Sequence, residues 1–281
     1  MTISLFVKSV FVLRAGFLIM LLTFTVPLYA KNETSMERIK RTKVLRAGVI
    51  SGAIPYFDKN NITNKWTGFG SDLSRKFAQH LGVEVKFIET TWGNAVMDLQ
   101  SNKIDIMFGM AETPARRNMI DFSSPVFQNT YTMLCKKGYP VKDWHEFNSS
   151  DVKVSVDLGS SMDNFITPML PMAKIMRFDS TTKATMALQA GRVDCQVLVI
   201  LQAQSLLNKY PDIGSIQVPN PILTAPVSIG LQREINPDFK DSINSWIESE
   251  RANGDIKNVI LKNAKELSGI EPDDFPASIK F

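Results

Sequence analysis

The alternation of strand-like and helix-like segments along this chain constrains its fold more than any other feature of the sequence. Apolar residues two positions apart indicate a strand, and apolar residues three or four positions apart indicate a helix. The first predicted series is strand 44–50, helix 71–81, strand 83–88, helix 93–100 and strand 104–107. Gly82 follows the first of these helices, where glycine commonly ends one. Strands separated by helices predict an α/β domain with a largely parallel sheet.

A second series of the same kind follows the first. Its predicted elements are strands 131–135 and 152–156, helix 161–170, strand 175–178, helix 181–190, strands 193–199 and 227–231, and a helix over 236–254. Open parallel sheets bind ligands beyond the carboxyl ends of their strands. Two such domains that face each other would therefore form a cleft from the loops of both.

The composition is that of a globular protein long enough for two domains. The chain has 281 residues, of which 44% are hydrophobic and 21% are charged. Its net charge of +4 falls to +2 without residues 1–30, whose only charged side chains are Lys8 and Arg14. So small an excess of positive charge gives no reason to expect nucleic acid as a partner.

The first thirty residues have the pattern of a secretory signal peptide. Lys8 and Arg14 form a positively charged region before an apolar stretch over residues 15–26. The small residue Ala30 stands at the expected cleavage site. A retained membrane anchor is the alternative, but an anchor extended back to Leu5 would bury both basic residues in hydrocarbon. We therefore expect an exported protein that works in the periplasm.

Two cysteines, Cys135 and Cys195, are present in the whole sequence. In an oxidising compartment they could form a disulfide. Two buried thiols on neighbouring strands are the alternative, and the sequence leaves both open.

Several segments, in this order along the chain, resemble the bacterial extracellular solute-binding proteins of family 3, the receptors of ABC importers for polar amino acids. The resemblance covers residues 37–262. The segments that carry it are ERIKRTKVLRAGV (37–49), TGFGSDLSRKFAQHLGVEVKFI (67–88), WGNAVMDLQSNKIDIMFGMAETPARRNMIDFSSPVF (92–127), VSVDLGSS (154–161), ALQAGRVD (187–194) and a closing helix SWIESERANGDIKNVI (245–260).

The resemblance implies an α/β type II periplasmic-binding-protein fold, in which two crossing strands join two lobes around a ligand cleft. Lobe 1 would comprise residues 31–129 and 226–281, and the inserted lobe 2 would comprise residues 130–225. The crossings are expected near 128–131 and 224–227. The implied function is the substrate-binding component of an ABC-type uptake system, a monomer that closes around a small carboxylate-bearing solute and delivers it to the permease in the inner membrane. No cofactor, metal or enzymatic activity is expected.

The resemblance also places the solute-binding residues. Arg116 stands where the family has its carboxylate-binding arginine, and its planar fork of donors matches a carboxylate bidentately. Ser160 and Ser161 open a helix whose backbone N–H groups can bind the same carboxylate. Trp92 is expected as an aromatic wall of the site, with Ile54 facing it. A solvated Arg116, a simple serine N-cap and a structural Trp92 are the alternatives.

Two departures from the family pattern concern the solute's amine. Gly109, Ala111 and Val199 complete the expected site. Amino-acid receptors of the family usually carry a hydroxyl residue at the position of Ala111 and an acidic residue at the position of Val199. Burying an ammonium without a carboxylate partner costs several kcal/mol. We therefore expect a solute that keeps a carboxylate but lacks a conventionally placed α-amino group, unless Glu112 turns inward and pairs with an amine.

Two other functions deserve comparison. A periplasmic dehydratase acting on prephenate-like acids shares this scaffold, but the sequence has no nucleophile elbow, metal-ligand cluster or dinucleotide fingerprint. His80 and His145 are isolated and are expected to be solvated. The sensing lobe of a receptor would need a membrane span after the domain, and none is expected here.

Overall fold

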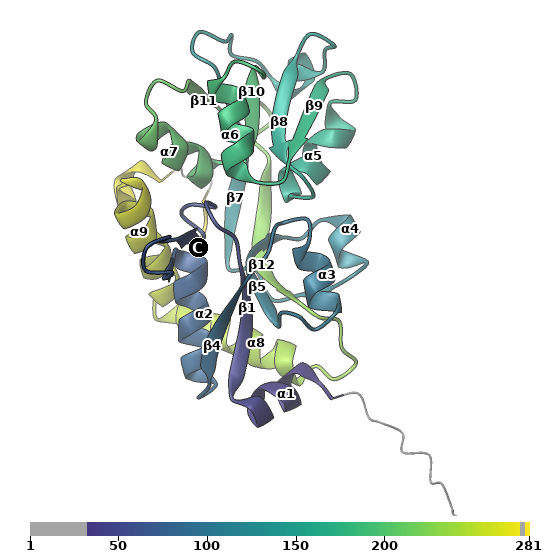
Figure 1. The fold of residues 1–281 in the computed structure, drawn as a ribbon, viewed down its shortest axis with the longest axis vertical. Helices are drawn as coiled ribbons and strands as arrows, with labels where there is room; N and C mark the ends of the chain where they lie inside the picture. Colours follow the sequence, from purple (N-terminus) through teal and green to yellow (C-terminus); the bar gives the residue numbers. More distant parts are fainter. Residues whose placement is uncertain (1–32, 276–278) are drawn as a thin grey trace, which may run out of the picture. The chain divides into compact units, whose positions relative to one another are not determined.

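Ten strands of the described chain join into a mixed sheet, in which β6 (Asp121–Phe122) pairs with β12 and β11 (Ser215–Gln217) pairs with β7. The main path of this sheet runs in the order β4 (Glu84–Glu89), β1 (Val44–Val49), β5 (Ile106–Ala111), β12 (Thr224–Leu231), β7 (Phe127–Cys135), β10 (Cys195–Val199), β8 (Lys153–Asp157), β9 (Lys174–Phe178). Strands β2 (Asp58–Lys59) and β3 (Trp66–Thr67) pair in a separate two-stranded sheet. The computed structural model describes residues 33–275 and 279–281. The signal peptide expected over residues 1–30 lies outside the described residues. The described part is an α/β fold of the type II periplasmic-binding-protein kind, as expected, with two lobes that meet along its two longest strands (Figure 1).

Lobe 1 contains the first predicted series. Strand β1 (Val44–Val49) lies parallel to β4 (Glu84–Glu89) and to β5 (Ile106–Ala111), which confirms the expected parallel core of the sheet. The helices of this lobe are α1 (Ser35–Thr42), α2 (Phe69–His80), α3 (Ala95–Gln100), α4 (Pro114–Arg117), α8 (Asp238–Ala252) and α9 (Asp255–Ser268). Its short strands are β2 (Asp58–Lys59), β3 (Trp66–Thr67) and β6 (Asp121–Phe122).

Lobe 2 contains the second series. Strand β10 (Cys195–Val199) lies parallel to β8 (Lys153–Asp157), which in turn lies parallel to β9 (Lys174–Phe178). Helices α5 (Ser161–Met169), α6 (Thr181–Gln189) and α7 (Ile200–Lys209) accompany these strands. The 3-10 helix η1 (Trp144–Phe147) and strand β11 (Ser215–Gln217) also belong to lobe 2, whereas the 3-10 helix η2 (Pro272–Asp274) belongs to lobe 1.

Two strands run between the lobes. Strand β7 (Phe127–Cys135) pairs antiparallel with β12 (Thr224–Leu231), from Phe127 opposite Val227 to Thr130 opposite Thr224. This paired stretch coincides with the two crossings expected from the sequence. Beyond it, β12 pairs with β5 of lobe 1, and β7 pairs with β10 of lobe 2. Each lobe therefore receives one strand that continues through the junction.

The expected closing helix over residues 245–260 is wrong in one respect. Gly254 adopts a left-handed conformation with φ of 81°, so the segment forms two helices, α8 and α9, instead of one. An L side chain rarely adopts this conformation, which is why glycine stands at the bend. Helix α9 also packs against α7 of lobe 2, where the Ser205 hydroxyl donates to the Ser268 hydroxyl at 2.7 Å.

The apolar stripe of α2 shows how the pattern produces the core. Leu73 and Phe77 are fully buried, and the Phe77 ring packs against the Trp246 ring of α8 at 5.2 Å between centroids. Residues three or four apart lie on one face of a helix, so these apolar positions meet the sheet and α8 together. Among the described residues, no helix combines the length and the apolar character that a membrane span requires.

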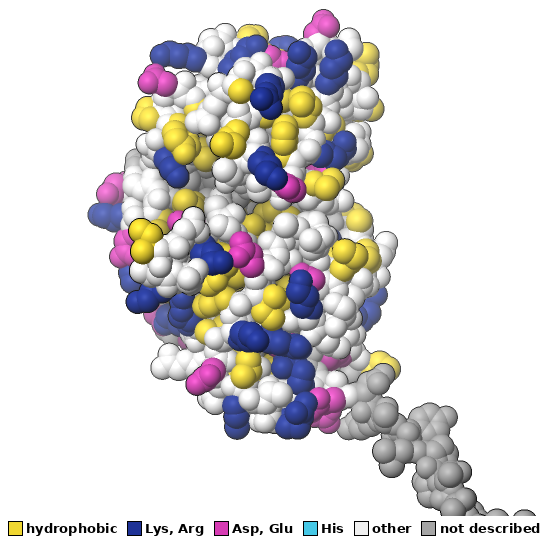
Figure 2. Space-filling view, in the orientation of Figure 1, with side chains coloured by type: hydrophobic (Ala, Val, Ile, Leu, Met, Phe, Trp, Pro, Cys, Tyr) yellow, Lys and Arg dark blue, Asp and Glu magenta, His cyan; other side chains and the backbone are white. Residues whose placement is uncertain are grey.

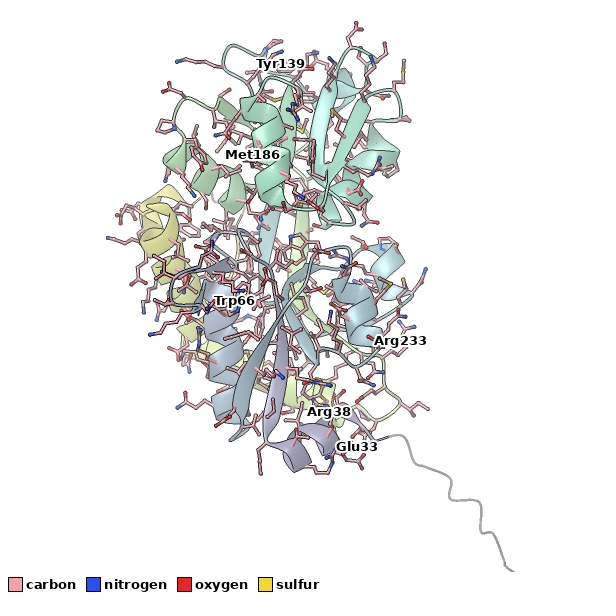
Figure 3. The ribbon with its side chains drawn as sticks, viewed as in Figure 1. Glu33, Arg38, Trp66, Tyr139, Met186 and Arg233 are labelled. Atoms are coloured by element: carbon pink, nitrogen blue, oxygen red, sulfur yellow. A yellow bond between two sulfur atoms is a disulfide. The ribbon has the colours of Figure 1, made fainter. Side chains whose placement is uncertain are left out.

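Polar groups are also buried at the base of lobe 1. The carboxylate of Asp105, just before β5, is buried and pairs with Arg38 of α1 and Arg46 of β1. Figure 3 shows Arg38 at the end of lobe 1 that is remote from the junction with lobe 2. A buried charge requires such partners, so this cluster fixes α1 against the sheet and plays no part in the junction.

Cys135 and Cys195 form a disulfide. They lie directly opposite each other on the antiparallel strands β7 and β10, with their Cα atoms 3.9 Å apart. Of the two states that the sequence left open, the structure therefore has the disulfide. Both residues are fully buried in lobe 2.

Candidate functional site

A cavity lies where the two lobes meet. It encloses about 380 Å³ of space between atoms, part of it open to solvent. Figure 2 shows that the surface is indented at this junction. The cavity is lined by Tyr56, Trp92, Gly109, Ala111, Arg116, Asn129, Tyr131, Ser160, Ser161, Met162, Val199, Gln202, Ala225 and Val227. These residues come from both lobes and from both crossing strands, so the cavity is a feature of the junction.

Arg116 provides the cationic side chain of the cavity wall. The short helix α4 positions it, because Thr113 caps this helix by accepting from the Arg116 backbone N–H and Pro114 occupies its first position. Its Nη1 donates to the Ala111 carbonyl at 3.1 Å, and its Nη2 donates to the Gly159 carbonyl of lobe 2 at 3.1 Å. The residue is only 4% exposed. It is therefore buried in the cavity wall.

The charge of this guanidinium has no carboxylate partner among the described residues. Burial is the main influence on Arg116 and lowers its pKa to about 10, with the nearby Tyr131 acting in the opposite direction. The group remains charged at neutral pH. A buried charge held only by neutral carbonyl dipoles is incompletely compensated, and an anion that enters the cavity would complete its pairing.

Ser160 and Ser161 lie at the start of α5, as expected from the sequence. The Ser160 hydroxyl caps the helix by accepting from the Asp163 backbone N–H at 3.1 Å. Both serines also line the cavity, so the capping role and a position at the site occur together. The neighbouring Tyr131 ring stacks on Phe165 of the same helix at 4.3 Å, which fixes α5 against the crossing strand.

Trp92 forms an aromatic wall, but the ring beside it is that of Tyr56 and not the side chain of Ile54. Trp92 is 8% exposed and meets the Tyr56 ring edge-on at 6.4 Å between centroids. The turn between Ala53 and Phe57 directs Tyr56 into the cavity, where its hydroxyl bonds to Asn129. Ile54, two residues earlier, does not line this cavity but lines a neighbouring groove with residues of α6 and α7, among them Gln202, which lines both.

Ala111 and Val199 both line the cavity, and Glu112 does not. The Glu112 carboxylate accepts from the Ser228 hydroxyl at 2.8 Å and pairs with Arg117. Its side chain is therefore engaged away from the cavity and supplies no partner for an amine. No aspartate or glutamate is among the residues that line the cavity in the described part of the chain. Gly109, with φ of 82°, also lines it, beside the ring of Tyr56.

The lobes touch beside the cavity at glycine positions. A Cβ atom on Gly159 would lie 2.7 Å from the Cα atom of Gly93, and one on Gly52 would lie 2.9 Å from the Thr182 hydroxyl. Gly93 and Gly52 belong to lobe 1, whereas Gly159 and Thr182 belong to lobe 2. The absence of side chains at these glycines permits the backbones of Gly159 and Gly93 to approach closely, and permits the Thr182 side chain to approach Gly52.

Sequence reasoning missed several residues of the cavity wall. Asn129, Tyr131, Ala225 and Val227 lie in or beside the expected crossings, so their neighbourhood was predictable although their contact with the cavity was not. No feature of the sequence indicated that Tyr56, Met162 or Gln202 would lie at the cavity. The part of the chain that the structure describes contains no group of three or more His, Cys, Asp or Glu residues that could hold a metal ion.

The buried carboxyl group of Asp157 lies at the end of β8, two residues before Gly159. Burial raises its pKa to about 6, although a hydrogen bond from the Thr181 hydroxyl acts in the opposite direction. Its second oxygen, Oδ1, has no hydrogen-bond partner among the described residues. Asp157 does not line the cavity, so its carboxyl is a structural group of lobe 2.

Two hinged lobes around a shared cavity define a two-lobed binding protein. A family model described as bacterial extracellular solute-binding proteins, family 3, matches residues 45–265. Because the match spans most of the chain, this chain belongs to that family. The resemblance drawn from the sequence motifs is confirmed.

Individual relatives include both binding proteins and an enzyme. The chain is 24% identical to the L-cystine-binding protein TcyJ of Escherichia coli over 227 residues, which cover 80% of this chain and 84% of that protein. It is 21% identical over 226 residues to the cyclohexadienyl dehydratase of Pseudomonas aeruginosa, covering 79% and 83% of the two chains. The crystal structure of an ancestral amino acid-binding protein, AncCDT-1, described as a precursor of cyclohexadienyl dehydratase, matches with a TM-score of 0.74 and 28% identity. That match covers 82% of this chain and 99% of the other.

Proposed function

We propose that this protein is the substrate-binding component of an ABC-type uptake system and captures a small carboxylate-bearing solute by lobe closure. One observation carries the proposal: Arg116 is buried in the wall of a cavity between the lobes, without a carboxylate partner among the described residues. A planar guanidinium in such a place matches the two oxygens of a carboxylate. The start of α5 at Ser160 and Ser161 supplies further N–H donors from lobe 2.

Capture would bring together groups from both lobes. In this proposal, lobe 1 comprises residues 31–129 and 226–281, and lobe 2 comprises residues 130–225. The paired stretch of β7 and β12 acts as the hinge, since it is where the chain passes between the lobes. The protein works as a monomer in the periplasm after removal of residues 1–30, and its closed form is recognised by an inner-membrane permease.

The test compares two adjacent arginines. Native mass spectrometry of the exported protein, purified without denaturation, identifies any solute that it retains. Isothermal titration of refolded protein with that solute then measures affinity. Arg116→Met should weaken binding about tenfold to a hundredfold, because a charge-assisted hydrogen bond contributes about 1.5–3 kcal/mol.

Arg117→Met is the matched control. The Arg117 side chain is 62% exposed and pairs with Glu112 outside the cavity, so its loss should leave solute affinity unchanged. Equal affinities for the Arg116→Met variant and the unaltered protein would overturn the proposal, provided that both unfold at similar temperatures.

A dehydratase is the second candidate, because a cyclohexadienyl dehydratase is among the relatives. Loss of water from an acid substrate requires a group that protonates the departing hydroxyl. No carboxylate lines the described cavity, and burial raises the pKa of the Tyr131 phenol, so it is a weaker acid still. These features favour binding without turnover. Catalysed conversion of prephenate by the purified protein would support the enzyme instead.

A further inference from the structure

Helix α7 begins at the cavity without a side-chain cap. Its N-cap residue, Val199, has an extended backbone and no side-chain oxygen, so no side-chain hydrogen bond caps the helix. The first N–H groups of a helix lack partners within the helix and carry partial positive charge. Val199 and Gln202, from the first turn of α7, both line the cavity. The positive end of this helix therefore faces the same space as Arg116.

The side-chain amide of Gln202 adds an independent hydrogen-bond donor at the N-terminal end of α7. The residue is 2% exposed, and its amide Nε2 has no hydrogen-bond partner among the described residues. Native proteins rarely leave a buried amide donor unpaired, because it has lost its water without gaining another acceptor. An oxygen acceptor held at the start of α7 would pair with this amide.

The acids near the cavity are engaged elsewhere. Glu112 pairs with Arg117, and Asp163 accepts from the Gly159 backbone N–H at 3.0 Å and from Arg177 at 2.8 Å. Neither of them lines the cavity. The described wall thus offers donors at Arg116, at the start of α5 and at the start of α7, with no carboxylate that could receive an ammonium group.

We propose that the start of α7, with Gln202, is a second oxygen-acceptor site, and that the solute is a small dicarboxylate. This inference rests on the proposed function, in which Arg116 and the start of α5 bind one carboxylate. The second carboxylate lies where α7 begins. Charge balance favours this class: one guanidinium and two helix N-termini of about half a charge each amount to about two positive charges, which two carboxylates match.

The experiment uses matched sets of acids on the refolded, full-length exported protein. Succinate, glutarate and adipate each carry two carboxylates, whereas butyrate, pentanoate and hexanoate have the same chain lengths with one. Isothermal titration should show at least one diacid binding about tenfold or more tightly than its monoacid partner. The set of standard L-amino acids is titrated under the same conditions.

Variants at the start of α7 test the location. Val199→Asp and Val199→Asn both supply a favourable N-cap, so both should fold, but only aspartate adds a negative charge. Val199→Asp should weaken diacid binding about tenfold more than Val199→Asn does. Gln202→Leu should weaken diacid binding more than it weakens binding of the monoacid with the same chain length. Thermal unfolding of each variant verifies that it is folded.

The outcomes separate this inference from the proposed function. If a monoacid, or an L-amino acid with a single carboxylate, binds as tightly as any diacid, and Arg116→Met weakens that binding, the second acceptor site is wrong and the proposed function stands. The same holds if native mass spectrometry finds a retained solute with one acidic group. If no acid binds at all and no solute is retained, both proposals fail.

Discussion

Arg116 of lobe 1 donates from Nη2 to the backbone carbonyl of Gly159 in lobe 2, at 3.1 Å. A second donor of the same guanidinium bonds to the Ala111 carbonyl, so neutral backbone groups of both lobes fix its position. Carbonyl dipoles orient a cation but compensate its charge only in part. The arrangement therefore keeps a pre-oriented positive charge at the junction. Because the hydrogen bond to Gly159 crosses between the lobes, it links that charge to their closure.

Gly159→Ala should impair lobe closure. Gly159 has φ of 69°, and its added Cβ atom would lie 2.7 Å from Gly93 Cα across the junction. The backbone strain alone should lower the free energy of unfolding by about 1–2 kcal/mol. The clash should in addition weaken solute binding about tenfold, as measured by isothermal titration. In small-angle X-ray scattering, the solute-bound Gly159→Ala variant should have a larger radius of gyration than the solute-bound unaltered protein.

Gly191→Ala is the control for this variant. Gly191 has nearly the same φ, 67°, but an added Cβ atom would meet nothing within 4 Å. It should lose similar stability and keep full solute affinity. If both variants lose affinity equally, the contact between Gly159 and Gly93 has no special part in closure.

Ser160→Ala should reveal two roles of one hydroxyl. Ser160 caps α5 and lines the cavity, whereas Ser180 caps α6, accepting from Lys183 N–H at 3.4 Å, and does not line it. Each serine-to-alanine variant should lower the free energy of unfolding by about 1 kcal/mol. Only Ser160→Ala should also weaken solute binding. Unchanged affinity in both variants would assign Ser160 to capping alone.

Asp157→Asn should remove a pH dependence of stability. The pKa of Asp157 is raised from 3.8 to about 6, chiefly by burial, so the folded state binds its proton more tightly than the unfolded state does. The free energy of unfolding that this group contributes is therefore fully present below about pH 4 and is lost as pH rises through about 6. Urea unfolding near pH 4 and near pH 8 measures how far the free energy of unfolding falls as pH rises. This fall should be smaller in Asp157→Asn than in the unaltered protein, by up to about 3 kcal/mol. A fall equal to that of the unaltered protein would contradict this account.

Removal of the disulfide should affect stability and leave recognition intact. The bond closes a loop with a sequence separation of 60 residues. Replacing both Cys135 and Cys195 with alanine should lower the free energy of unfolding by about 2–4 kcal/mol, because the unfolded chain regains freedom. Neither residue lines the cavity, so solute affinity measured below the unfolding temperature should not change. A large loss of affinity would indicate that the bond also positions β7 at the hinge.

The sequence predicted the strands and helices where one pattern dominated. Helix α2 and strand β4 lie within one or two residues of their predicted bounds, because their apolar faces repeat at the helical and strand periods. Helix α7 was not predicted, since its first residues continue the apolar run of β10 without a capping residue. Strand β5 runs further than expected, to Ala111, because pairing with β12 extends it past Gly109.

For this protein, the sequence by itself determined the α/β class, the family and the identity of the residues in its motifs, among them Arg116, Ser160 and Val199. Those properties follow from local periodicity and from residue order. Only the tertiary structure decided that Glu112 turns to Arg117, that Tyr56 and not Ile54 faces Trp92, and that α7 begins uncapped at the cavity. The direction of a side chain depends on contacts with segments that are distant along the chain, and such contacts exist only once those segments are folded together.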